Sequence, residues 1–302
     1  ELVLTDIFKQ KPLTIKKASG GQFNKVYLAD FADQKVVVKI FTDPEEPIPG
    51  KDVWLDHVLE LHAIPHAKLL YSSRANTYYT YGLCISTFVE GGNAREAIDK
   101  KKMTEEEFVG LAAKLLKPVH AIKLAKYGYD TTSDVIEFMI DPMLEINDCQ
   151  FVEDYNLAEP IAIGTEIVHK IITKYKSRFF PVLTHGDCAA KNTVQNLTQG
   201  DLLIDWDNSE GNVWIADYSW LLFWWRRDHV PEEQIARYEK AFFSSYGTPQ
   251  DFSMEEIEEI VYAFHIRTAV LILQYFFEVR KDLNEFDAVR QFLDRLIQGD
   301  KK

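Results

Sequence analysis

The stretch that decides the fold of this chain is His185-Gly186-Asp187-Cys188-Ala189-Ala190-Lys191-Asn192. Thirteen residues after Asn192, Asp205 ends the apolar run Leu202-Leu203-Ile204. Glycine followed by an acid is typical of a tight loop, and a short apolar run is typical of a buried strand. The pattern therefore predicts a loop that carries Asp187 and Asn192, followed by a strand that ends at Asp205.

These three side chains have the chemistry that phosphoryl transfer needs. A kinase requires a carboxylate beside the acceptor hydroxyl, a carboxamide oxygen on Mg²⁺, and a second carboxylate between the metal and the phosphates. Asp187, Asn192 and Asp205 can supply these groups in that order. Each residue alone would be an ordinary turn or strand-end residue. Their combination favours a kinase site.

Length and composition predict one large globular domain or two smaller ones. The chain has 302 residues, of which 46% are hydrophobic, and this is enough material for a core. Cys84, Cys149 and Cys188 lack the spacing of a zinc site or a disulfide scaffold, so we expect a reducing, cytoplasmic compartment. The net charge of −13 disfavours a nucleic-acid partner and is compatible with a cationic small substrate, although an acidic surface also serves solubility.

No signal peptide and no membrane partner are expected. The start of the chain lacks the basic region and apolar core of a secretion signal. The apolar stretch from Trp220 to Trp225 is too short to span a bilayer, and Arg226 and Arg227 end it. The oligomeric state stays open.

Hydrophobic periodicity predicts an α+β protein with two lobes, residues 1–89 and 90–302, and Gly91-Gly92 lies near the change. In the first lobe it predicts strands at 13–18, 25–30, 35–41, 68–72 and 77–89, and one main helix at 52–64. In the second lobe it predicts helices at 104–122, 162–176, 231–246, 253–280 and 284–298. Thr104 and Glu107 form a capping-box start for the first of these helices.

Two features of the first lobe are typical of a nucleotide site. Ser19, Gly20 and Gly21 lie between two predicted strands, where backbone N–H groups can approach phosphates, although Gly-Gly is also a common hairpin turn. Lys39 lies within the β-branched run 35–41, and its side chain projects from one face of that strand. In a kinase such a lysine contacts the α- and β-phosphates and is oriented by an acid on the next helix.

That orienting acid is Asp56 or Glu60, which lie one turn apart on one helix face. Glu60 has the longer reach, and Asp56 is favoured because it lies farther from the helix end. Both could also be ordinary exposed helix charges.

Taken together, these residues resemble the aminoglycoside phosphotransferase and choline kinase superfamily over nearly the whole chain. The resemblance is carried by the glycine loop, Lys39, the helix acid, His185-Gly186-Asp187 with Asn192, and Ile204-Asp205-Trp206-Asp207. It implies a protein-kinase-like fold, with a small antiparallel β-sheet lobe that carries one main helix and a larger, mostly helical lobe. It also implies ATP and Mg²⁺ as cofactors.

The resemblance implies a role for individual residues. Asp187 would be the catalytic base, and Asn192 and Asp205 would bind the metal. Asp217 would support the catalytic loop without touching substrate. The backbones of Thr87 and Val89 would meet adenine.

Three departures from the family pattern stand out. The helix acid is Asp56 where Glu is usual, Asn212-Val213-Trp214 precedes Asp217 in place of Gly-Asp-Pro, and Cys188-Ala189-Ala190-Lys191 resembles a tyrosine-kinase loop. Two features argue against a protein kinase. Gly186 replaces the Arg that protein kinases use to read a phosphorylated activation loop, and the twelve residues from Asp205 to Asp217 leave no room for a full activation segment.

Other conspicuous residues have simpler explanations. The Trp220–Trp225 aromatic residues could form a cage for an ammonium group, but their spacing is that of a buried helix. The glutamates at 255, 256, 258 and 259 could bind a polyamine, but a solvated helix start is the better default. His185 would brace its loop. The other conspicuous histidines show no metal-ligand spacing: His62, His66, His120, His229 and His265.

The sequence therefore predicts an ATP-dependent small-molecule kinase that phosphorylates a hydroxyl of a cationic acceptor, with an aminoglycoside as the lead substrate. The alternatives are a choline, amino-alcohol or sugar kinase of the same superfamily, and a nucleotide-binding pseudokinase that acts as a scaffold. Motifs of this kind do not identify the acceptor.

Overall fold

The computed structural model describes residues 1–18, 24–42, 48, 50–74, 76–196 and 200–299. The chain divides into two compact units, and each is described separately. Unit 1 comprises Glu1–Ala97 and Lys191–Asp207, and unit 2 comprises Ile98–Ala190 and Asn208–Lys302. The division lies later than the predicted boundary at residue 89, and it assigns a segment from the second half of the chain to unit 1. The boundary between residues 89 and 90 stays a prediction.

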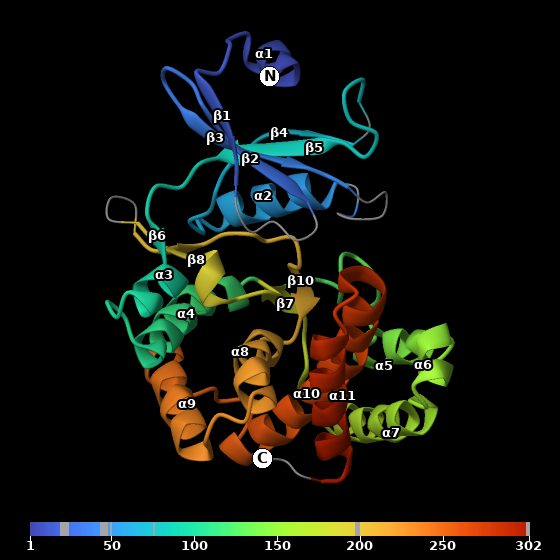
Figure 1. Ribbon diagram of the computed structural model, residues 1–302. Coiled ribbons are helices and arrows are strands. Elements are labelled where there is room, and N and C mark those ends of the chain that lie inside the picture. Colours follow the sequence, from blue (N-terminus) through green and yellow to red (C-terminus); the bar gives the residue numbers. More distant parts are fainter. Residues whose placement is uncertain (19–23, 43–47, 49, 75, 197–199, 300–302) are drawn as a thin grey trace. The chain divides into compact units, whose positions relative to one another are not determined.

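Unit 1 contains a five-stranded antiparallel sheet with the strand order β1-β2-β3-β5-β4 (Figure 1). Its strands are β1 (Thr14–Lys17), β2 (Lys25–Asp30), β3 (Lys35–Ile40), β4 (Leu69–Ser73) and β5 (Leu83–Thr87). A smaller sheet in the order β6-β8-β9 contains β6 (Gly92–Asn93), β8 (Thr193–Gln195) and β9 (Leu202–Leu203). The 3₁₀ turn η2 (Ala190–Asn192) leads into β8, and α3 (Ala94–Asp99) spans the division between the units.

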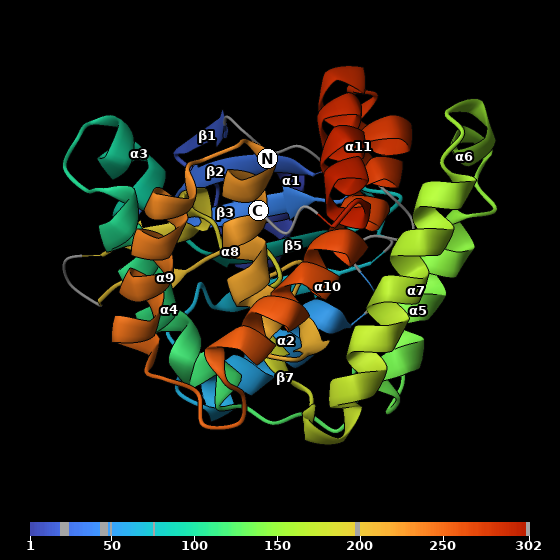
Figure 2. The same ribbon diagram turned by 90° about the horizontal axis from the view of Figure 1, so that it is seen from below.

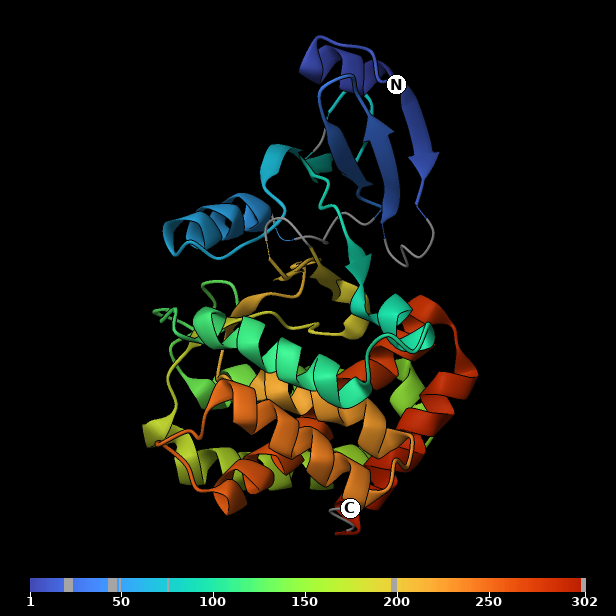
Figure 3. The same ribbon diagram turned by 90° about the vertical axis from the view of Figure 1, so that its left-hand side faces the viewer.

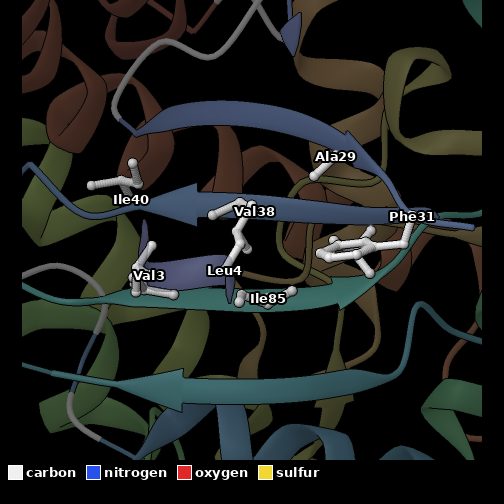
Figure 4. Close-up of a cluster of buried hydrophobic side chains, with 9 residues drawn as sticks. Val3, Leu4, Ala29, Phe31, Val38, Ile40 and Ile85 are labelled. Carbon is white, nitrogen blue, oxygen red and sulfur yellow. The ribbon is translucent and has the colours of Figure 1, made fainter. Parts of the chain in front are cut away.

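The two faces of the large sheet carry different helices. Val36, Val38 and Ile40 of β3 are buried against α1 (Leu2–Phe8), together with Leu4 of that helix (Figure 4). The alternate residues of β3 face α2 (Lys51–Leu61), because successive side chains of a strand point to opposite faces. Lys39 is therefore presented on the α2 face.

Unit 2 is mostly helical. Its helices are α4 (Glu105–His120), α5 (Val135–Ile146), α6 (Gln150–Asp154), α7 (Ala158–Tyr175), α8 (Ile215–Arg227), α9 (Glu232–Tyr246), α10 (Met254–Gln274) and α11 (Leu283–Ile297). The short turns are η1 (Lys176–Arg178) and the π-helical η3 (Tyr275–Arg280), and β7 (Val182–Thr184) pairs with β10 (Glu210–Asn212). Helix α10 packs against α5, α7, α8 and α11, while α4 packs against α9 (Figures 2 and 3).

The α+β class and the protein-kinase-like architecture are confirmed by the antiparallel sheet and the helical remainder. The predicted capping box of α4 is present, because Thr104 accepts from Glu107 N and Glu107 accepts from Thr104 N. The prediction of one long strand at 77–89 was wrong in its first half, where residues 77–82 form turns and only Leu83–Thr87 pairs. Helices α1, α3, α5 and α6 were not predicted.

One helix among the described residues, Met254–Arg280, is long and apolar enough to cross a membrane by length and composition alone. Of the 18 most apolar consecutive residues of this helix, 61% are buried inside the protein. Because α10 packs against four neighbouring helices, its apolar composition is that of a core helix.

Candidate active site

Lys39 brings together two acids that lie far along the chain from it. Its ammonium is 2.9 Å from Asp205 Oδ1 and 2.7 Å from Asp207 Oδ2. The Lys39 side chain is 17% exposed, whereas those of Asp205 and Asp207 are 46% and 40% exposed. The three residues line one pocket of about 130 Å³ on the α2 face of the sheet. A buried cation that faces two half-exposed carboxylates is suited to a ligand with alternating charges.

The charge on Lys39 is maintained by these acids. Burial disfavours the ammonium, but Asp207 and Asp205 more than offset this effect, so the pKa of Lys39 is raised above its usual value. Cys84 is directly opposite Lys39 in the sheet. Burial raises the pKa of the Cys84 thiol to about 12, against the attraction of Lys39, so this thiol stays protonated.

The sequence predicts that Asp56 orients Lys39, but the structure does not bring these two residues together. Asp56 Oδ1 accepts hydrogen bonds from Leu69 N over 2.7 Å and from His66 Nε2 over 3.1 Å. Glu60, the alternative acid, pairs with Lys68 at 3.0 Å. The short Asp56 side chain is held by the start of β4, and the acids after β9 take its place at Lys39. Asp56 nevertheless lines the same pocket.

The two predicted metal ligands lie on neighbouring segments of unit 1. Asn192 is buried, and its carbonyl accepts a hydrogen bond from Ile204 N over 2.8 Å. This bond extends the pairing of β8 with β9 to the residue before Asp205. Asp205 has a φ of 62°, a left-handed conformation that Asp tolerates better than most residues. The strand end is thus turned so that Asp205 and Asp207 both reach Lys39.

Oxygen donors from Asn192, Asp205 and Asp207 fit Mg²⁺, which proteins bind through one or two carboxylates together with substrate phosphates. No group of three or more His, Cys, Asp or Glu side chains among the described residues forms a metal site by protein ligands alone. A magnesium ion here would therefore depend on phosphate oxygens as well.

The predicted adenine-contacting segment is at the end of β5. Thr87 N donates to Lys68 O over 2.9 Å, so this N–H group is already paired, and the contact of the Thr87 backbone with adenine stays a prediction. The N–H and C=O groups of Val89 form no hydrogen bond with any other described residue. Val89 therefore keeps its predicted role as a proposal. Ser19, Gly20 and Gly21 lie outside the described residues.

In unit 2, a buried carboxylate holds the loop that carries Asp187. Asp217 accepts three hydrogen bonds: from His185 N over 2.7 Å, from Gly186 N over 2.8 Å and from His120 Nε2 over 3.0 Å. Burial opposes the charge of Asp217, but the bond to His120 and the nearby His185 outweigh it and lower the pKa of Asp217. This geometry agrees with the supporting role that the resemblance implied for Asp217.

The conformation of the same loop requires Gly186. Its φ is +76°, and a Cβ at this position would lie 2.2 Å from Asn208 O. His185 is fully buried, and its Nδ1 accepts from Asp187 N over 3.2 Å. His185 thus braces the loop, as expected. The backbone around Asp187 is held by Asp217 and by the His185 ring.

The side chain of Asp187 has a partner that the sequence analysis missed. Trp220 Nε1 on α8 donates to Asp187 Oδ1 over 3.2 Å. Trp220 is half-buried, and its ring meets the Trp224 ring edge to face at 5.4 Å. The aromatic spacing of α8 predicts a buried helix, and Phe223 is buried. No sequence signal showed that Trp220 reaches Asp187.

The glutamates at the start of α10 were expected to form a solvated helix start, but two of them form ion pairs with residues of α7 and η1. Glu256 pairs with Arg178 at 2.7 Å, and Glu259 pairs with Lys174 at 2.6 Å. Glu255 accepts from Ser253 Oγ. For Asp207 the sequence predicts no role beyond its place in the Ile204-Asp205-Trp206-Asp207 motif, and the structure shows that it contacts Lys39.

A family model described as "Phosphotransferase enzyme family" matches residues 14–256. The chain belongs to this family. The match includes every site residue named above, from Lys39 on β3 to Trp220 on α8. The search of curated proteins finds no match for this phosphotransferase-family chain.

Solved structures show the same fold at low sequence identity. A thermostable mutant of aminoglycoside phosphotransferase APH(4)-Ia, in a ternary complex with ADP and hygromycin B, is 15% identical, covers 99% of this chain and 97% of its own, and has a TM-score of 0.74. Choline kinase LicA from Streptococcus pneumoniae is 16% identical, covers 97% and 98%, and has a TM-score of 0.66. The gentamicin complex of APH(2")-IIa is 17% identical, covers 97% and 94%, and has a TM-score of 0.68.

Proposed function

We propose that this member of the phosphotransferase family is an ATP-dependent small-molecule kinase that phosphorylates a hydroxyl group of a cationic acceptor. The observation that carries the proposal is the contact of Lys39 with Asp205 and Asp207. These residues are 166 and 168 positions apart from Lys39 in the sequence. The family and the nucleotide-bound structural neighbours support the kinase assignment.

In this proposal unit 1 binds the nucleotide. Lys39 aligns the α- and β-phosphates, the loop with Ser19, Gly20 and Gly21 covers them, and the backbones of Thr87 and Val89 meet adenine. Asn192 and Asp205, with Asp207, would hold Mg²⁺, which would neutralise charge on the phosphates. Lys39 forms ion pairs with both Asp205 and Asp207.

Asp187 of unit 2 acts on the acceptor. Its carboxylate accepts the proton of the acceptor hydroxyl as that oxygen bonds to the γ-phosphorus. The bond from the γ-phosphorus to the β–γ bridging oxygen breaks at the same time, and ADP leaves. Trp220 holds one carboxylate oxygen, and Asp217 fixes the backbone of the loop.

The proposal of a cationic acceptor rests on the net charge of −13. The proposal of an aminoglycoside rests on the family and on structural neighbours whose complexes contain hygromycin B or gentamicin. Choline kinase LicA among the neighbours keeps an amino alcohol as the second acceptor class. We also propose that the enzyme works in the cytoplasm, where ATP is present and where its three free cysteines stay reduced.

The test is ATP consumption by the purified chain with panels of aminoglycosides, amino alcohols and neutral sugars, and with Asp187→Asn as the matched inactive control. Acceptor-dependent ADP release by the wild-type chain alone supports the proposal. Nucleotide binding without turnover across all panels would instead favour the pseudokinase scaffold. Failure to bind any nucleotide would contradict both functions.

A further inference from the structure

A second cavity lies on the face of the unit 1 sheet opposite to Lys39. Its volume is about 580 Å³, compared with about 130 Å³ for the pocket at Lys39. The floor consists of buried apolar side chains, Val38 and Ile40 of β3 and Leu4 of α1 (Figure 4). This volume and apolar floor are typical of a small-molecule site.

The walls of this cavity are rich in aromatic rings. Tyr27 of β2 and Phe41 line it, together with Tyr78, Tyr79 and Tyr81 from the loop before β5. Tyr78 is 45% exposed and Tyr81 is 38% exposed, so large aromatic surfaces face solvent on one side of the cavity. Tyrosine rings offer an apolar face for stacking and a hydroxyl at the edge. The walls therefore favour a planar aromatic ligand.

The charges at the cavity indicate the polar group of such a ligand. Lys25, the first residue of β2, lines the cavity and is exposed. It has no ion pair or hydrogen-bonded side-chain partner within the described parts of the chain. Glu1 also lines the cavity, but its carboxylate pairs with Lys11 at 2.9 Å. Among the described residues, Lys25 thus offers the cavity an unpaired ammonium, which is suited to an acid group.

We propose that this cavity is a second binding site, which takes a planar aromatic molecule that carries one acid group. The ring system would lie on Val38 and Ile40 between the tyrosines, and the acid would face Lys25. Most of the affinity would come from apolar burial, because an exposed ion pair contributes little.

The position of the cavity connects it to the nucleotide pocket. Val38 and Ile40 flank Lys39 on one strand, and Lys25 is paired with Ile40 across the sheet. A ligand that packs on β2 and β3 from this face of the sheet restrains β3, and β3 presents Lys39 on the opposite face. We expect an occupied cavity to change nucleotide affinity, and nucleotide to change ligand affinity by the same factor. This coupling rests on the proposed nucleotide site, whereas binding to the cavity does not.

The probe for the site is 1-anilinonaphthalene-8-sulfonate, a fluorescent aromatic acid, titrated against the full chain. We expect one saturable site that persists with saturating Mg²⁺ and a non-hydrolysable ATP analogue. Lys25→Gln should weaken binding roughly threefold, the size of an exposed ion pair. Thr80→Trp, at an exposed position in the cavity lining, should block binding by filling the space. Lys16→Gln, on the exposed strand β1 outside the lining, is the matched control and should bind normally.

Three outcomes would overturn the site. The dye could be displaced completely by the nucleotide analogue, which would put it in the Lys39 pocket. Lys25→Gln and Lys16→Gln could bind it equally, or Thr80→Trp could bind it undiminished. Thermal unfolding of each variant checks that the native state is intact. A fluorescent nucleotide titrated with and without the dye tests the coupling, and equal affinities would refute an effector role. Because the dye titration needs no turnover, its failure is distinguishable from failure of the kinase proposal.

Discussion

Trp220 donates the hydrogen of its indole nitrogen to Asp187 Oδ1 over 3.2 Å. The donor comes from α8 and the acceptor from the loop after β7, so the bond connects an aromatic helix to the proposed catalytic carboxylate. It restrains rotation of that carboxylate. Trp220 is therefore a positioning residue for the proposed base.

Trp220→Phe should lower kcat about tenfold, the value of one hydrogen bond to a charged group, and leave the KM for MgATP unchanged. Trp224→Phe, on the neighbouring ring, is the control and should leave kcat unchanged. Equal kcat values for the two variants would show that the indole hydrogen does not act on Asp187.

Asp187→Asn should reduce turnover by a factor on the order of 10² or more, because the amide cannot accept the hydroxyl proton. ATP binding should stay nearly intact, since the proposed nucleotide ligands belong to unit 1. Steady-state turnover and nucleotide titration measure the two effects separately. A variant that turns over its best substrate at the wild-type rate would remove Asp187 as the base.

Asp205→Ala should abolish Mg²⁺-dependent turnover, because it removes a carboxylate ligand that Asn192 cannot replace. Asp207→Asn should raise the Mg²⁺ concentration needed for half-maximal activity and leave Lys39 with one acidic partner. Activity titrated against Mg²⁺ concentration is the measurement. Asp201→Ala, before β9, removes the same charge and should titrate like the wild type. Undiminished Mg²⁺-dependent activity of Asp205→Ala would exclude Asp205 from the site.

His265, in the middle of α10, should make the protein sensitive to acid. Burial, with a smaller effect of the Arg226 charge, lowers the pKa of His265 to about 3 from a usual value of 6.5. Its folded pKa is below its unfolded pKa, so protons favour the unfolded state. The contribution of His265 to the free energy of unfolding should therefore be fully present above pH 6.5. It should fall toward pH 3, by up to about 1.4 kcal/mol per pH unit.

Thermal unfolding across this pH range measures that slope. His265→Phe, which keeps the aromatic contacts with Phe223 and Phe292, should flatten this slope, whatever the unfolding temperature of the variant itself. His169→Gln, at an exposed position on α7, should keep the wild-type slope. The same slope in all three proteins would mean that other groups cause the acid sensitivity.

The KM of the best amine-containing acceptor should rise with ionic strength, while the KM for MgATP changes less. The physical reason is that a protein of charge −13 attracts a cationic acceptor and salt screens that attraction. Initial rates at several salt concentrations give both constants. A neutral or anionic sugar as the best substrate would contradict the cationic acceptor and leave the kinase proposal intact.

The sequence alone determined the features that depend on neighbouring residues. The β-branched run 35–41 predicted a strand with Lys39 on one face, and the Thr104–Glu107 pair predicted the start of α4. The loop with Asp187 was recognisable because a few adjacent residues define it. These signals survive because strand alternation, helix capping and tight turns are local preferences of the chain.

The partners of these residues were decided only by the tertiary structure. Lys39 contacts Asp205 and Asp207, not the nearby Asp56, and Asp187 receives a hydrogen bond from Trp220. Nothing in the local pattern distinguishes an acid that reaches Lys39 from one that is held by Leu69 N and His66. Such choices depend on the packing of segments that are distant in sequence, where side-chain reach, burial and competing hydrogen bonds select one partner among several of the right chemistry.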